Sequence, residues 1–301
     1  MNYKALFKNQ DFRFKILKLL SCIPDKTMVK IQYRIKTGRH LDLNNPKRFT
    51  EKLQWYKIYY RNPIMHQCVD KYEVRKYVES KGLSNILNEL YGVYDSVDEI
   101  DFDNLPEKFV AKTTAGSGGQ NVFICADKSK INTEEFLQTL DKWQKNNPKK
   151  NYGREWAYEG IKNRIIIEKL LESDKNGLAD YKFFCFNGEI KYIYVISERQ
   201  LGHRATLGIY DAEFNKINAY RCDEQKQIES YKKPNDFELM KQYATILSKD
   251  FPHARIDFYE NSNRIIFGEI TFYDGSGYMT YEPDEFDYRL GEDFNIGDIN
   301  E

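Results

Sequence analysis

Apolar and polar residues recur mostly at helical spacing through the first 100 positions of the chain. One helix is predicted just after Thr50, whose side chain can cap its N-terminus. A second helix is predicted from Lys71 to Lys81, ending at Gly82. We therefore expect residues 1–104 to form a mainly helical N-terminal region.

The pattern changes near Pro106. Two short apolar runs, at 108–112 and 121–125, flank a glycine-rich loop and predict a β-hairpin. Residues 133–146 then carry apolar side chains at helical spacing, which predicts an amphipathic helix. We expect residues 105–163 to form a small sheet unit that carries the glycine-rich loop.

From residue 164 onward the strand signal dominates. Asn187-Gly188 separates two apolar runs and is a strong signal for a two-residue hairpin turn. The predicted strands are 164–170, 181–186, 191–197, 204–211, 254–260 and 265–272, with one helix at 236–250. An α+β fold follows, with a larger sheet unit over residues 164–301.

Composition narrows the class of protein. The 301 residues include 46 Lys+Arg and 46 Asp+Glu, so the basic surface of a general nucleic-acid binder is not expected. Aromatic residues make up 15% of the chain, which argues against disorder. The five scattered cysteines include no CxxC pair and indicate reduced thiols in a cytoplasmic protein, rather than a zinc site or a disulfide framework.

The stretch from Phe12 to Ile23 is apolar but is interrupted by Arg13, Lys15 and Lys18. It is too short and too charged to span a bilayer. Two interpretations remain: a basic amphipathic helix that makes peripheral contact with the inner face of the membrane, and a helix packed on its own protein. The second is favoured.

The segment 109–122 combines a strand, a lysine and a glycine-rich loop. Glycines let backbone N–H groups approach a phosphate, and Lys112 at the strand end adds a point charge for the same anion. The loop residues are Gly116, Ser117, Gly118 and Gly119. A flexible hairpin loop without a ligand is an equally good interpretation of this segment alone.

Asp257 and Glu269 lie on two consecutive predicted strands, and each is flanked by apolar residues. Buried carboxylates side by side repel one another unless a cation lies between them, and Mg²⁺ binds one or two carboxylates together with phosphate oxygens. The alternative is a salt bridge to Arg255 or Lys112. The metal interpretation is favoured.

Glu168 interrupts the apolar strand at 164–170 and therefore needs a donor partner. A strand that leads into a hinge can present polar groups to an adenine ring. A structural ion pair explains the same residue equally well.

In their order and spacing, these segments resemble the ATP-grasp superfamily in its D-alanine–D-alanine ligase-like arrangement, over about residues 70–290. The resemblance implies two α+β subdomains that clasp ATP, with the glycine-rich loop as a flap over the phosphates. The implied contacts are phosphate contacts from Lys71 and Lys112, adenine contacts from the Glu168 side chain and the Leu170 backbone, and a ribose contact from Asp180.

The pair of strands near the end of the chain resembles the metal-binding hairpin of that superfamily. The resemblance implies that Arg255 stabilises the transferring phosphoryl group and that Asp257 and Glu269 bind magnesium. Thr271 stands where the superfamily usually has asparagine, and its hydroxyl or carbonyl group can still ligate a second ion. The turn at 273–277 stands where related ligases place the acceptor substrate.

A closer resemblance is to the TupA-like ATP-grasp family, found with teichuronopeptide, capsule and other surface-polysaccharide genes. It is carried by 37–55, 70–78, 180–190 and Leu290-Gly291, and it covers nearly the whole chain. Members are often labelled glycosyltransferases, which the residues above do not support. Lys182 and Arg199 lie in its distinctive strands, and two interpretations remain for them: contact with phosphate or an acidic substrate, and exposed strand cations. The second is favoured.

The resemblance implies a carboxylate–amine ligase that uses ATP and Mg²⁺. ATP would phosphorylate a carboxylate, small or linked to a glycan, and an amine such as an amino acid would displace the phosphate. The alternatives are a nucleotide-sugar glycosyltransferase with 101–103 (DFD) as its metal motif, a kinase, and a non-catalytic nucleotide-binding module. A solvated loop explains 101–103 better than a metal site.

Overall fold

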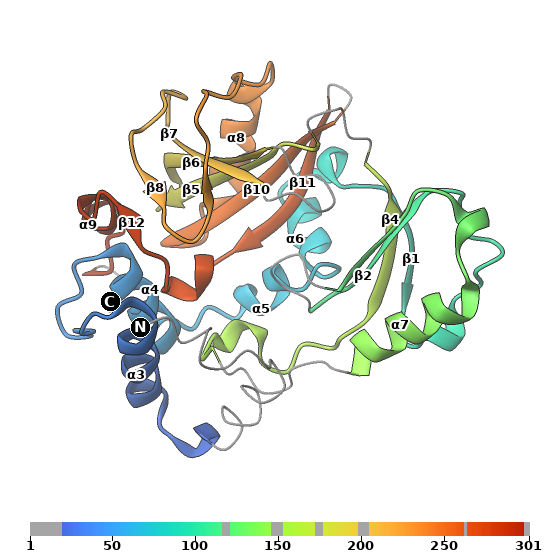
Figure 1. Ribbon diagram of the computed structural model, residues 1–301, viewed down its shortest axis with the longest axis horizontal. Coiled ribbons are helices and arrows are strands. Elements are labelled where there is room, and N and C mark those ends of the chain that lie inside the picture. Colours follow the sequence, from blue (N-terminus) through green and yellow to red (C-terminus); the bar gives the residue numbers. More distant parts are fainter. Residues whose placement is uncertain are drawn as a thin grey trace.

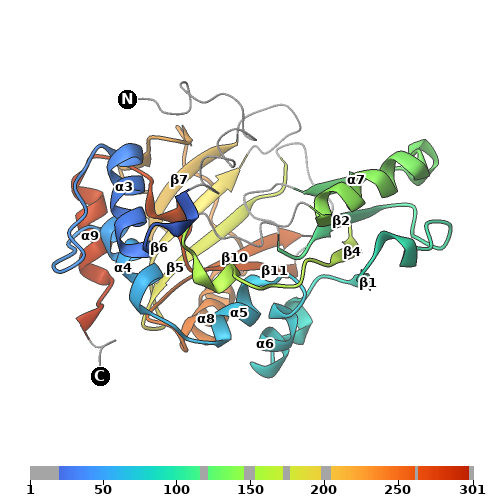
Figure 2. The same ribbon diagram turned by 90° about the horizontal axis from the view of Figure 1, so that it is seen from below.

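The computed structural model describes residues 20–115, 121–145, 153–171, 177–197, 205–261 and 264–297. These residues form an α+β fold with a four-stranded sheet and a six-stranded sheet, each with its own hydrophobic core (Figure 1). Helices from the start and the end of the chain pack beside the larger sheet, at the end of the molecule opposite the smaller one (Figures 1 and 2).

The larger sheet has the strand order β11-β10-β5-β6-β7-β9 and is antiparallel except for the β7–β9 pair. Its strands are β5 (Asp180–Phe186), β6 (Glu189–Ser197), β7 (Thr206–Asp211), β9 (Gln225–Lys226), β10 (His253–Asn261) and β11 (Arg264–Thr271). The predicted turn between β5 and β6 is confirmed, because Asn187 and Gly188 have φ angles of 51° and 80°, as a primed turn requires. Helix α8 (Phe237–Ser248) packs against β5, β6 and β10.

The smaller sheet has the order β1-β4-β2-β3. The hairpin of β2 (Phe109–Thr113) and β3 (Val122–Cys125) is confirmed. So is the amphipathic helix α7 (Thr133–Lys145), whose Phe136 and Leu140 are buried against this sheet. The other strands are β1 (Leu90–Tyr94) and β4 (Ile165–Lys169), so the sheet extends beyond both predicted limits of the small unit, 105 and 163.

The N-terminal region is less uniformly helical than the sequence predicted, because β1 is a strand. Its helices are α3 (Asp25–Thr37), α4 (Phe49–Tyr59), α5 (Ile64–Val69) and α6 (Val74–Ser80). The helix predicted from Lys71 to Lys81 therefore begins three residues late, and Lys71 precedes it. Gly82, with a φ of 77°, follows its end as predicted.

Helix α4 lies against α9 (Glu285–Asp293), near the end of the chain (Figure 1). Thr50 was wrongly predicted to cap α4, because the helix begins at Phe49 and Thr50 lies within its first turn. Its backbone N–H and hydroxyl donate to the buried Asp287 carboxylate of α9 at 3.0 and 2.8 Å. Gly291 of α9 approaches so closely that a side chain there would collide with the carbonyl oxygen of Lys47.

A short two-stranded sheet joins β8 (Tyr220–Arg221) to β12 (Tyr281–Glu282). Between β11 and β12, Asp274–Gly277 form a turn in which Gly275, Ser276 and Gly277 all have positive φ. This turn packs against α4.

Candidate nucleotide and metal site

Asp257 of β10 and Glu269 of β11 are direct cross-strand partners and lie side by side, as the sequence predicted. Both accept hydrogen bonds from Nη2 of Arg255, at 2.7 Å from Asp257 and 2.9 Å from Glu269. Because all three side chains meet on one face of the sheet, the antiparallel hairpin itself creates the acidic pair.

The Asp257 carboxylate is buried and also lies 2.5 Å from Nζ of Lys182, which in turn lies 2.7 Å from Asp180. Lys182 was expected to be an exposed cation, and this is wrong: it is 8% exposed. Its position is explained by its two acidic neighbours, which neutralise a buried ammonium group. Arg199 lies outside the described residues.

The sequence left open a salt bridge from Asp257 and Glu269 to Arg255 or Lys112. The structure shows it to Arg255, whereas Lys112 pairs with Glu168. Burial raises the pKa of Asp257, and Arg255 and Lys182 only partly offset this. Burial also acts to raise the pKa of Glu269, but Arg255, Lys182 and Lys71 outweigh it and lower the value to about 2. Glu269 is thus an anion at any physiological pH.

The donor set of this site fits magnesium. Thr271 donates its hydroxyl to the Glu269 carboxylate at 3.1 Å, and Glu269 lies opposite Asp257, so this strand pair carries three oxygen-bearing side chains close together. Mg²⁺ prefers such oxygen ligands and takes the remainder from phosphate and water. Among the described residues there is no group of three or more His, Cys, Asp and Glu that could hold a metal alone. Magnesium binding by Asp257, Glu269 and Thr271 stays a prediction.

Lys112 of β2 lies 2.6 Å from Glu168 of β4, and Arg75 lies 3.7 Å from the same carboxylate. The structural ion pair that the sequence left open for Glu168 is thus present, while its contact with adenine stays untested. The two residues lie on neighbouring strands of the smaller sheet, so the ion pair holds the Lys112 ammonium close to the C-terminal end of β2, which precedes the glycine-rich segment in sequence.

Lys71 lies near both the Asp257–Glu269 pair and the Lys112–Glu168 pair. Its backbone N–H donates to the Thr114 carbonyl, beside the end of β2, at 3.1 Å. Burial lowers the pKa of its ammonium group, Glu269 of the larger sheet opposes this, and Lys112 of the smaller sheet adds to it. Lys71 is therefore within electrostatic range of the acidic pair and of the Lys112–Glu168 pair.

The remaining predicted residues differ in what the structure says of them. Asp180 opens β5 and is buried against Lys182, and Leu170 follows β4 and is half-buried. Their contacts with ribose and adenine stay predictions. The loop residues Gly116, Ser117, Gly118 and Gly119 lie outside the described residues.

Sequence reasoning missed Asp274, which bridges two arginines. This buried carboxylate accepts a hydrogen bond from Arg255 and a second, at 3.2 Å, from Arg221 of β8. Asp274 belongs to the turn at 273–277, which the sequence analysis singled out, but one partner of its carboxylate, Arg221, comes from a more distant part of the chain. It ties Arg255 of β10 to the turn at 273–277.

Helix α4 also supports the turn at 273–277 through side-chain hydrogen bonds. Lys57, fully buried, donates to the Ser276 carbonyl at 2.7 Å, and Gln54 donates to the Ser276 and Gly277 carbonyls at 2.9 Å each. Burial lowers the pKa of Lys57 to about 8, and Glu155 partly offsets this. Nothing in the local sequence distinguishes Lys57 from the exposed lysines of other helices.

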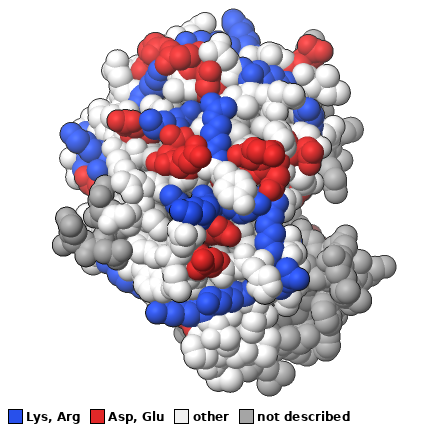
Figure 3. Space-filling model, turned by 90° about the vertical axis from the view of Figure 1, so that its left-hand side faces the viewer, with Lys and Arg blue, Asp and Glu red and all other residues white. Residues whose placement is uncertain are grey.

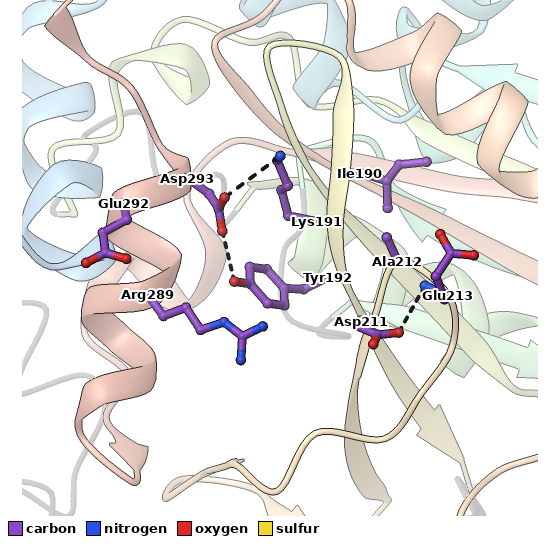
Figure 4. Close-up of a pocket in the computed structure, with 9 residues that line it drawn as sticks. All are labelled: Ile190, Lys191, Tyr192, Asp211, Ala212, Glu213, Arg289, Glu292 and Asp293. Carbon is purple, nitrogen blue, oxygen red and sulfur yellow. Dashed lines mark hydrogen bonds and ion pairs between the residues drawn. The ribbon is translucent and has the colours of Figure 1, made fainter.

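A separate hollow of about 480 Å³ lies between β6, the end of β7 and α9 (Figure 4). Two of its carboxylates are engaged by lining residues: Asp293 accepts from Tyr192 at 2.8 Å and lies 4.0 Å from Lys191, and Asp211 accepts from the Glu213 N–H. None of the residues predicted to bind nucleotide or metal lines it. We therefore do not assign it to ATP.

Comparison with solved structures finds ligases. D-alanine–D-alanine ligase from Bacillus anthracis is 17% identical with a TM-score of 0.44, over 68% of this chain and 57% of that chain. Another structure of the same enzyme is complexed with ATP. The enzyme from Helicobacter pylori is 16% identical with a TM-score of 0.45, over 76% of this chain and 61% of that chain. The chain thus spans less than two thirds of the length of these ligases.

No curated protein matches the chain in a sequence search. The family described as TupA-like ATPgrasp, in contrast, matches residues 51–295. That range contains Lys71, Lys112, Glu168 and the whole β10–β11 hairpin with its acidic pair. The chain belongs to the TupA-like ATP-grasp family.

Proposed function

We propose that this protein is an ATP-dependent carboxylate–amine ligase that works through an acylphosphate. The observation that supports this most is the arrangement around Arg255, which holds Asp257, Glu269 and Asp274 together between the nucleotide lysines and the turn at 273–277. A phosphoryl donor at the lysines and an acceptor at the turn would meet at this guanidinium group.

In the proposed reaction, an acceptor carboxylate oxygen forms a bond to the γ-phosphorus of ATP, and the bond to the ADP oxygen breaks. An amine then attacks the acyl carbon, phosphate leaves, and the amine proton passes to solvent. Magnesium bound at Asp257 and Glu269 would neutralise phosphate oxygens. Lys71 and Lys112 would hold the ATP phosphates, and Arg255 would stabilise the transferred group.

The acceptor class is part of the proposal. We propose a carboxylate carried by a small molecule or a glycan, such as a uronic acid of a capsule or cell-surface polymer precursor, joined to an amino acid. The resemblance to the TupA-like family, with its polysaccharide gene context, supports this choice. The reaction would take place in the cytoplasm, where ATP is available.

The test compares Asp257→Asn and Glu269→Gln with the wild type in an ADP-release screen over uronic acids and amino acids. Both variants should lose Mg-ATP-dependent turnover. Glu260→Gln, also on β10 but outside the acidic pair, is the matched control and should keep it. Circular dichroism checks that each variant is folded. Wild-type turnover in both folded variants would refute the metal assignment.

The products separate the ligase from its rivals. A kinase would leave phosphate on the product, and a non-catalytic module would bind ATP without releasing ADP for any acceptor. A glycosyltransferase would bind UDP-sugars rather than ATP. Its proposed motif at 101–103 lies in a surface turn, where Asp101 and Asp103 are exposed and Asp101 accepts hydrogen bonds from Asn104.

A further inference from the structure

The outward face of α3 carries two parallel rows of side chains. One row is basic and the other is apolar except for a threonine, and within each row the residues are four positions apart. Such residues lie one above another on a helix, so each row runs along the axis. The basic row is Lys26, Lys30 and Arg34, and the neighbouring row is Thr27, Ile31 and Ile35. The opposite face, with Met28, Val29, Gln32 and Tyr33, is buried in the protein.

The two isoleucines are unusually open to solvent for their type. Ile31 is 39% exposed and Ile35 is 52% exposed. A single exposed isoleucine needs no explanation, but two adjacent ones along a helix form a continuous apolar strip. Covering this strip with an apolar partner removes it from water, which lowers the free energy of the system.

The basic row keeps its positive charge. None of its three cations forms an ion pair with any residue that the structure describes, and Arg34 donates only to the Gly38 carbonyl that follows the helix. The acidic residue nearest in sequence, Asp25, is engaged by Arg154 at 2.7 Å. Figure 3 shows basic side chains crossing the lower part of this side of the molecule, the side on which α3 lies in Figure 1.

We propose that this face of α3 binds peripherally to an anionic lipid bilayer, with the basic row at the headgroups and Ile31 and Ile35 at their boundary with the acyl chains. A helix that lies flat with basic and apolar rows side by side has the geometry of an interfacial helix. Each Lys or Arg near an anionic surface raises partitioning about fivefold, so three raise it on the order of a hundredfold.

The position of α3 suits such a contact. Figures 1 and 2 both place it at the end of the molecule opposite the smaller sheet, so docking leaves that sheet facing away from the bilayer. Among the described residues, no helix combines the length and the apolar character needed to cross a bilayer.

The test measures sedimentation of the full chain with phosphatidylcholine vesicles, with and without 30 mol % phosphatidylglycerol, at low and high salt. The wild type should bind the anionic vesicles and dissociate at high salt. Lys26→Gln/Lys30→Gln/Arg34→Gln should reduce binding at least tenfold, because the charge complement is lost. Ile31→Gln/Ile35→Gln should reduce it severalfold while preserving the salt response.

Matched controls remove the same groups elsewhere. Lys108→Gln/Lys142→Gln/Lys232→Gln deletes three exposed lysines, and Ile228→Gln deletes an isoleucine that is 86% exposed. Both controls should bind as the wild type does. Equal loss in the lysine control, or no preference of the wild type for anionic vesicles, would overturn the proposal. The proposal would also fall if, in the absence of vesicles, the Ile31→Gln/Ile35→Gln variant had a lower melting temperature or a changed oligomeric state. That result would mean that the apolar strip is covered by protein and not by lipid.

Discussion

The ammonium nitrogen of Lys57 lies 2.7 Å from the carbonyl oxygen of Ser276. The two residues belong to a helix that precedes both sheets and to a turn that follows the β10–β11 hairpin. Ser276 has a φ of 55°, a conformation that non-glycine residues rarely adopt, so the turn depends on outside support. The N-terminal region thus helps to shape the proposed acceptor site.

Lys57→Met should therefore impair use of the acceptor more than use of ATP. Losing a charged donor costs about 1.5–3 kcal/mol, which corresponds to a loss of roughly ten- to hundredfold in kcat/KM for the acceptor. The dissociation constant of ATP, measured by calorimetry, should stay unchanged. Lys52→Met is the matched control, because Lys52 donates from the same helix to the Gly291 and Phe294 carbonyls instead. Equal effects of both variants on the acceptor would refute the role of Lys57.

If Lys112 has the proposed phosphate role, Lys112→Ala should weaken ATP binding by about tenfold or more, since a point charge for the phosphates is lost and Glu168 loses its nearest cation. Calorimetric titration of ATP measures this directly. Lys108→Ala, just before the same strand but exposed, should leave the affinity unchanged. An unaltered ATP affinity in Lys112→Ala would count against its phosphate role.

His253 should make the protein sensitive to acid. The ring is fully buried, its Nδ1 lies 3.0 Å from the Cys185 carbonyl oxygen, and burial lowers the pKa from 6.5 to about 4. As the pH falls, the unfolded chain takes up the histidine proton before the folded chain does. The contribution of the neutral, buried His253 to the free energy of unfolding is therefore fully present above pH 6.5, and about 3 kcal/mol of it is lost as the pH drops towards 4. His253→Gln should remove this part of the slope in urea denaturation between pH 7 and 4. Parallel slopes for the two proteins would contradict the assignment.

Asp287→Ala should cost about 3 kcal/mol of unfolding free energy, because it leaves two donors of Thr50 without their buried acceptor and takes one acidic partner away from Arg48 and Arg39. Thermal and urea denaturation measure the loss. Asp284→Ala, which removes the more exposed partner of the same arginine, should cost less than about 1 kcal/mol. Similar losses in the two variants would show that Asp287 does not anchor α4.

The features that the sequence predicted well are local. The hairpins at Asn187-Gly188 and at Asp257 and Glu269 pair strands that are neighbours in sequence, so turn chemistry and alternation determine their register. The acidic pair of the candidate site follows directly from that register. Helix α7 was equally readable, because its buried face repeats at helical spacing.

The features that the sequence missed depend on distant partners. Strand β1 has only five residues and pairs with β4, far along the chain, so no local signal separates it from a helix. Lys182 looked exposed because a lysine in a strand usually faces solvent, and only the register of β5 against β10 brings Asp257 beside it. Asp274 likewise bridges two arginines only because the fold brings Arg221 of β8 next to it.

The close packing of α4 on α9 has a consequence for how the chain is made. The ribosome releases α4 long before it makes Asp287 and Gly291. Asp287 accepts the hydrogen bonds of Thr50 in α4, and Gly291 leaves the space that the Lys47 carbonyl fills just before α4. During synthesis α4 therefore stays without its last packing partner until α9 has been made. We expect a chain truncated before residue 285 to lack the anchor of α4, which packs against the turn at 273–277.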